Sequence, residues 1–173
     1  CNNNCSFCAA NVESDNRPDE TMELSIFKKA INDLRDYGYN ARIGFHGTSE
    51  PLITENLTEY VRYAREQLPD VWLQLLTNGL LLNVKNSKEL VDAGINEITV
   101  NWYNDKTALD RNKPLPEKFN QIIEKVIKKK FNKNQIMKGY GPHPIYKNNI
   151  FRYNINRRMK TDIMSNQAGA SPN

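Results

Sequence analysis

The sequence predicts an α/β fold in which parallel strands are covered by helices. Segments of strand length alternate with amphipathic segments of helix length, the strands are apolar on both faces, and turn-forming residues end most segments. The 173 residues correspond to about one domain.

The first expected element is an amphipathic helix over residues 24–38. Its apolar side chains recur at helical spacing, and Gly38 is expected to end it. The same alternation then repeats along the chain. We expect strands at 41–47, 71–79 and 95–103, and helices at 56–69, 86–94 (capped by Ser87) and 116–130. Beyond residue 131 the alternation fades, and residues 150–165 favour a hairpin.

The composition is that of a globular domain, with 39% hydrophobic and 25% charged residues. No apolar run approaches the roughly 18 residues of a membrane span. The net charge of +4 is concentrated late in the chain, where basic runs without interleaved aromatic residues favour a solvated helix face over a nucleic-acid partner. An odd number of cysteines, all in one loop, favours a reducing cytoplasm over a secreted disulfide scaffold.

The segment CNNNCSFC holds the three cysteines of the chain, Cys1, Cys5 and Cys8. Thiolates select zinc, copper(I) or iron-sulfur clusters. A structural zinc site needs four ligands, so zinc would require a fourth such as His46 or His143. An electron-transfer 4Fe-4S cluster also needs four. Three cysteines leave one iron of such a cluster without a protein ligand. An open coordination site on the cluster is what a chemical step requires.

This loop resembles the cluster loop of radical S-adenosylmethionine (radical SAM) enzymes. The resemblance implies that Cys1, Cys5 and Cys8 hold a 4Fe-4S cluster, and that the amino and carboxylate groups of S-adenosyl-L-methionine (SAM) chelate the fourth iron. Phe7 then either stacks near the adenine or fills the space under the loop.

FHGTSEPLI is similar to the glycine-rich turn after the next strand of this family. It matches at Gly47, Glu50 and Pro51, which implies that Gly47, Thr48, Ser49 and Glu50 cradle SAM. Ser49 stands where the family usually has glycine, and a non-glycine residue is disfavoured there if the backbone needs a positive φ.

LLTNG and VNWYND resemble the ends of the family's third and fourth strands. Asn101 occupies the place of a polar residue that often contacts the ribose or carboxylate of SAM. Asn78 is included in the implied SAM site, although Asn78 and Gly79 fit turn chemistry better. GYG at 139–141 is a weak match to an adenine-side glycine motif, and a plain loop fits it better.

The resemblance implies a partial (β/α)6 TIM-like barrel that is incomplete at both ends. Residues 1–130 would form the core without its first strand, and residues 131–173 an irregular or hairpin segment leading toward a C-terminal extension. SNQAGASPN is similar to the N-R-A-G element before the SPASM extension of some members, with Gln167 in place of arginine.

The implied activity is reductive cleavage of SAM to a 5'-deoxyadenosyl radical that removes hydrogen from a substrate. A flavodoxin or ferredoxin would donate the electron, and a peptide or protein is the first expectation for the substrate. A small molecule or cofactor precursor stays open as substrate. Two readings without catalysis also stay open: a zinc or iron-sulfur binding module, and a degenerate relative that lacks part of the site.

Overall fold

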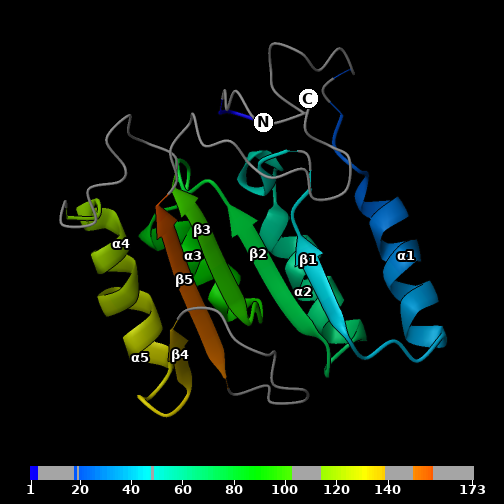
Figure 1. Cartoon of the computed structure of the whole chain (residues 1–173). Coiled ribbons are helices and arrows are strands. Elements are labelled where there is room, and N and C mark those ends of the chain that lie inside the picture. The colour runs from blue at the N-terminus through cyan, green and yellow to red at the C-terminus, as the bar shows by residue number, and fades with distance from the viewer. Residues whose placement is uncertain (4–17, 19, 48, 103–113, 139–149, 158–173) are drawn as a thin grey trace, which may run out of the picture.

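The computed structural model describes residues 1–3, 18, 20–47, 49–102, 114–138 and 150–157. These residues form one sheet with helices packed against it (Figure 1). The strands follow the order β1-β2-β3-β5-β4, and every neighbouring pair is parallel. Their bounds are β1 Arg42–Phe45, β2 Trp72–Thr77, β3 Glu97–Trp102, β4 Ile136–Lys138 and β5 Phe151–Arg157. The predicted α/β fold with parallel strands is confirmed.

The predicted helices are present close to their expected bounds. They are α1 Leu24–Asp36, α2 Leu57–Gln67, α3 Val84–Asp92, α4 Glu117–Ile122 and α5 Lys128–Lys130, with a 3-10 turn η1 at Pro51–Ile53. A π-helical segment, η2 Ile123–Ile127, joins α4 to α5, so the predicted helix at 116–130 is continuous. Among the described residues, no helix combines the length and the apolar character needed to cross a membrane.

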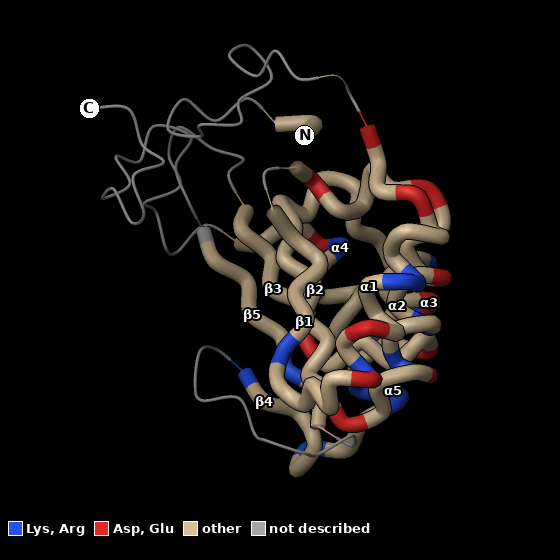
Figure 2. Tube along the Cα trace, turned by 90° about the vertical axis from the view of Figure 1, so that its right-hand side faces the viewer, with Lys and Arg blue, Asp and Glu red and all other residues tan. Residues whose placement is uncertain are grey.

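The helices α1 to α5 of the described residues lie on the same side of the sheet (Figure 2). Alternate strand residues face them and form the core, among them Leu73, Leu75, Ile98, Val100 and Phe151, each at most 4% exposed. Burial of one such side chain contributes about 1.5–3 kcal/mol. The helix side of the sheet therefore supplies most of the apolar stabilisation.

The opposite side of the sheet carries polar side chains, so the expectation of strands apolar on both faces is wrong. Glu97 accepts hydrogen bonds of 2.9 Å from the indole of Trp72, the amide of Gln74 and the hydroxyl of Thr99. Arg152 lies 3.9 Å from the same carboxylate. We call these five residues, which come from β2, β3 and β5, the Glu97 cluster. Burial of the Glu97 carboxylate is compensated by two donors on the neighbouring strand β2 and one on its own strand.

The cap of α3 differs from the prediction. Asn83 is the N-cap, and its side-chain oxygen accepts from the backbone of Asn86 while the Asn86 side chain accepts from the backbone of Asn83. This reciprocal pair is a capping box, which satisfies two backbone donors at once. The helix thus begins one turn earlier than expected, and Ser87 lies inside it, fully buried.

The hairpin predicted to begin at residue 150 is also wrong in its first arm. β5 pairs in parallel with β3 on one side and with β4 on the other, so neither of its edges serves a hairpin partner. The proposed second arm, beyond residue 157, lies outside the described residues. The division of the chain at residue 130 and the segment leading to an extension remain predictions.

Candidate functional site

The carboxyl ends of β1, β2 and β3 lie at one edge of the sheet, which we call the carboxyl edge. In parallel α/β folds this edge carries the functional loops. The connection after β1 holds residues 46–50, the connection after β2 holds residues 78–80, and the described N-terminal residues lie above the same edge (Figure 1). The structure thus brings the start of CNNNCSFC to the turn in FHGTSEPLI.

Glu50 fixes the connection after β1 to the end of β2. Its carboxylate, 3% exposed, accepts from the Thr77 hydroxyl at 2.6 Å, the Asn78 backbone at 2.8 Å and the Leu52 backbone at 3.1 Å. The last of these bonds also caps η1. The side chain of Glu50 is therefore committed to holding two connections together, and it does not point outward as a ligand.

The turn that precedes Glu50 is accessible. Gly47 and Ser49 are both exposed, and Thr48 lies outside the described residues. Among the described non-glycine residues only Asn56 has a positive φ, so Ser49 adopts its conformation without the strain that a positive φ would impose. The departure from the family glycine at Ser49 is tolerated by this backbone.

Asn78 connects the end of β2 to the beginning of the cysteine segment. Its amide donates to the side-chain oxygen of Asn2 at 2.7 Å, and its own side-chain oxygen accepts from the backbone of Leu80 at 2.9 Å. Asn78 therefore combines the turn role that the sequence favours with a contact to the residue beside Cys1, which is half-buried.

Gly79 is the residue that lets this turn pack against the sheet. Its φ is +77°, and a Cβ there would lie 2.6 Å from Val100 Cγ1 and 3.2 Å from Phe119 Cζ. We expect Gly79→Ala to lower the free energy of unfolding by about 2–3 kcal/mol, since it adds backbone strain and overpacking. Urea denaturation measures the change.

Gly38→Ala is the matched control for this substitution. Gly38 has a φ of +75°, but a Cβ there would meet nothing within 4 Å. The control isolates the backbone strain, which we expect to cost about 1 kcal/mol. Equal losses in the two variants would contradict the close approach at Gly79.

Lys118, at the start of α4, anchors the same turn, and the sequence reasoning did not identify it. Its ammonium donates to the carbonyls of Gly79 at 2.6 Å and Leu80 at 3.1 Å, and it lies 5.1 Å from the centre of the Trp102 ring. Partial burial lowers the pKa of Lys118. A lysine near the beginning of an amphipathic helix carries no sequence signal for such a role.

Asn101 lies near the end of β3, on the face of the sheet that points away from the helices. It accepts a hydrogen bond of 3.0 Å from the amide of Asn156 on β5. The two residues face each other in the register of the strands. Asn156 was not predicted; the alternation of apolar and polar residues in IFRYNI is the signal that would have placed it on this face.

Several predicted residues cannot be placed. Cys5, Phe7, Cys8, Thr48 and His143 lie outside the described residues, as do residues 139–141. His46, the other histidine considered as a zinc ligand, is exposed. Within the described part of the chain, no group of three or more His, Cys, Asp or Glu side chains is arranged to bind a metal ion. The predicted metal ligands thus rest on the sequence of the cysteine segment.

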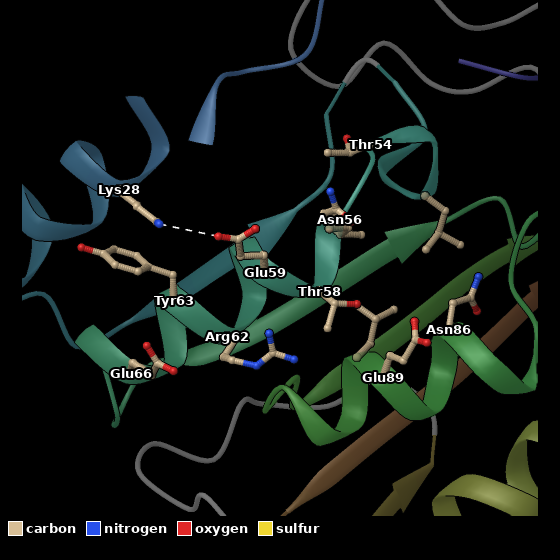
Figure 3. A pocket seen from close by; sticks show the side chains of 13 residues that line it. Lys28, Thr54, Asn56, Thr58, Glu59, Arg62, Tyr63, Glu66, Asn86 and Glu89 are labelled. Atoms are coloured by element: carbon tan, nitrogen blue, oxygen red, sulfur yellow. Dashed lines mark ion pairs between the residues drawn. The ribbon is translucent and has the colours of Figure 1, made fainter. Parts of the chain in front are cut away.

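Three pockets near these elements bear on the site. One, of about 450 Å³, follows the residues around Gly47 and Glu50 to the start of α1. The other, of about 760 Å³, opens on the outside of α2 and α3, where Lys28 and Glu59 form an ion pair of 3.6 Å (Figure 3). None of the predicted site residues lines the second pocket. The first pocket coincides with the candidate site, and so does a third pocket of about 650 Å³, which Cys1, Asn2 and Ser49 help to line.

Comparison with known proteins gives a consistent set of relatives. A model of the Radical SAM superfamily matches residues 1–144. The S-adenosyl-L-methionine-dependent 2-deoxy-scyllo-inosamine dehydrogenase of Niallia circulans is 30% identical over 100 residues, which are 58% of this chain and 40% of that protein. The GTP 3',8-cyclase of Sulfurovum sp. (strain NBC37-1) is 30% identical over 143 residues, 80% of this chain and 38% of that protein. The chain thus spans about two fifths of these relatives.

Solved structures resemble the fold. BtrN in an open conformation superposes with a TM-score of 0.50 at 27% identity, over 59% of this chain and 47% of that one. BtrN in complex with AdoMet and 2-DOIA gives a TM-score of 0.53 at 21% identity, over 87% of this chain and 52% of that one. The likeness shows a shared architecture of parallel strands and helices.

Proposed function

Because this chain belongs to the Radical SAM superfamily, we propose that the protein cleaves SAM reductively and uses the product to remove hydrogen from a substrate. The observation that carries the proposal is the 2.7 Å hydrogen bond from Asn78 to Asn2. It holds the start of the cysteine segment at the carboxyl edge, beside the turn that Glu50 fixes. The start of the cysteine segment thus lies at the same edge as this turn, which supports the proposal.

The donor set of the cysteine segment fits an iron-sulfur cluster with one iron left for SAM. Three thiols within eight residues form a soft donor set, and the segment begins at a half-buried cysteine on the functional edge of the sheet. Cys1, Cys5 and Cys8 would hold the cluster. When bound, a 4Fe-4S cluster supplies the electron that cleaves SAM to a 5'-deoxyadenosyl radical.

The protein's own groups bind and orient SAM in this proposal. The exposed backbone of Gly47 and Ser49 offers hydrogen-bonding groups, and Asn101 presents its amide near the same edge. Glu50, Asn78 and Lys118 keep the two connections in place, so the binding groups are preorganised before SAM arrives.

The substrate class is a further part of the proposal. Two relatives are named for 2-deoxy-scyllo-inosamine and GTP, which are small hydroxylated molecules. The sheet face that points away from the helices carries neutral amides and a hydroxyl near its carboxyl half: Thr99, Asn101, Asn154 and Asn156. Both observations favour a small hydroxylated substrate over the peptide or protein that the sequence suggested.

The test is anaerobic reconstitution of the full-length protein with iron and sulfide. We expect a brown protein that forms 5'-deoxyadenosine from SAM after chemical reduction with dithionite. A variant with alanine at Cys1, Cys5 and Cys8 should lose both the colour and the product. In the cytoplasm, a flavodoxin or ferredoxin is the proposed donor of the electron that dithionite supplies in this experiment.

The alternative is a metal-binding module without catalysis. A colourless protein that retains stoichiometric zinc and forms no 5'-deoxyadenosine would support it and refute the enzyme. A brown protein that forms no 5'-deoxyadenosine would instead indicate a degenerate site.

A further inference from the structure

Asn154 in β5 holds a hydrogen-bond donor that finds no acceptor within the part of the chain that the structure describes. The residue is 8% exposed, and its amide nitrogen Nδ2 has no hydrogen-bond partner among the described residues. Buried polar groups in folded proteins are nearly always paired, because an unpaired donor loses its bonds to water without replacement. A buried amide of this kind is a position at which a ligand can supply the missing acceptor.

The amide lies on the face of the sheet that points away from the helices. Phe151, Tyr153 and Ile155 pack in or against the core on the helix side, so Asn154 and Asn156 take the opposite side. The Asn156 amide bonds to Asn101, which confirms the side on which both lie. Asn154 therefore lies on the same face of the sheet as Asn101, a residue of the candidate site.

The described residues next to Asn154 do not supply an acceptor for its amide. Its register partner Thr99 donates its hydroxyl to Glu97 rather than accepting from the amide. β4 ends at Lys138, opposite Tyr153, so this strand does not reach the level of Asn154. Asn156 is two residues nearer the carboxyl edge, about 7 Å along the strand. Asn154 thus lies one layer below the Asn101–Asn156 pair.

Resting on the proposed function, we infer that the Asn154 amide donates a hydrogen bond to a hydroxyl or carbonyl oxygen of the substrate, below the layer that binds SAM. A neutral oxygen suits this position because Thr99 and Asn156 beside it are uncharged, and because Arg152 and Glu97, which lie on the same face, form an ion pair with each other. Asn154 is then a specificity residue for a small hydroxylated molecule.

The first test needs no ligand. Replacing the unpaired amide with an apolar side chain of similar size, Asn154→Leu, should leave the thermal midpoint of the full-length protein unchanged or raise it by about 2–4 °C. Asn154→Val provides a smaller side chain in case leucine overpacks the site. The matched control is Asn156→Leu, which breaks the bond to Asn101 and should lower the midpoint. A fall for both Asn154 variants equal to that of the control would overturn the inference.

The second test separates the substrate from SAM. With SAM bound to the reconstituted protein, the probes 2-deoxy-scyllo-inosamine and myo-inositol are titrated into wild type, Asn154→Leu and Asn154→Asp. We expect binding of at least one probe to wild type and about a tenfold higher Kd in both variants, with the Kd for SAM unchanged. Higher Kd values for SAM would assign the acceptor to SAM, and no binding of either probe to wild type would refute the ligand class; both results overturn the inference. Formation of 5'-deoxyadenosine by wild type, measured without a probe, reports separately on the proposed function.

Discussion

Glu50→Ala is expected to lower the free energy of unfolding by about 3–5 kcal/mol and to weaken SAM binding about tenfold or more. The carboxylate accepts from the backbones of Leu52 and Asn78, which cannot turn away, and from Thr77. Alanine leaves these donors buried without an acceptor and releases the connection after β1 from the end of β2. The turn with Gly47 then loses its fixed position.

Urea denaturation and SAM titration of the reconstituted full-length protein measure the two effects. Glu50→Gln retains one acceptor oxygen and should give intermediate losses. Glu55→Ala is the matched control, because Glu55 is an exposed carboxylate in the connection between η1 and α2. Its unfolding free energy should stay within about 0.5 kcal/mol of wild type. If Glu50→Ala behaved like this control, the proposed role of the buried carboxylate would be wrong.

Arg65→Ala is expected to cost about 3–4 kcal/mol of stability while leaving SAM binding unchanged. Arg65 lies near the end of α2, at the edge of the sheet opposite the candidate site. Its guanidinium, whose pKa is lowered by burial, donates to five oxygen atoms. They belong to the backbone of Leu68, Pro69, Val71 and Gly94 and to the side chain of Asn96.

The planar fork of arginine is what reaches so many carbonyls at once, so Arg65→Lys should recover only part of the loss. Arg62→Ala is the matched control, because Arg62 is exposed on the same helix. The same denaturation and titration experiments apply. A rise in the Kd for SAM comparable to that of Glu50→Ala would contradict the separation of a stabilising edge from a binding edge.

The periodic elements were predictable because local pattern decides them. Leu24, Phe27, Ile31 and Leu34 repeat at helical spacing, and α1 occupies most of the expected range. It ends at Asp36, and Gly38, just past the C-cap Tyr37, takes the positive φ that stops the helix. Ser87 failed as a cap because two residues, Asn83 and Ser87, had suitable side chains, and the reciprocal bond to Asn86 selected the first.

The strand β5 shows why topology was harder. IFRYNI alternates apolar and polar residues, which fits both a hairpin arm and a central strand with one polar face. Sequence alone does not say which strands will lie beside it, since this depends on how the chain returns from α5. The pairing with β3 and β4 decides the choice.

The candidate site could be predicted where a sequence motif indicates its residues. It could not be predicted where residues take part only through packing between distant segments. The turn at Gly47 and Glu50 and the residue Asn101 were implied by the resemblance of FHGTSEPLI and VNWYND to family motifs, and their contacts with SAM stay predictions. Three other features depend on contacts between segments far apart in sequence. They are the hydrogen bonds that turn the Glu50 carboxylate inward, the bonds from Lys118 to the turn after β2, and the bond from Asn156 to Asn101. No spacing rule reports such contacts.

The Glu97 cluster also bears on how the sheet reaches its correct alignment during folding. A slip of β2 by one residue against β3 would turn Trp72 and Gln74 toward the helices and bring Leu73 and Leu75 opposite the carboxylate. Glu97 would then lose its two donors from β2 and keep only Thr99 and Arg152, at a cost of about 1–3 kcal/mol for each lost bond. A misaligned sheet would thus lose stabilising contacts on both faces. The Glu97 cluster therefore favours the correct pairing of the strands as well as the stability of the folded sheet.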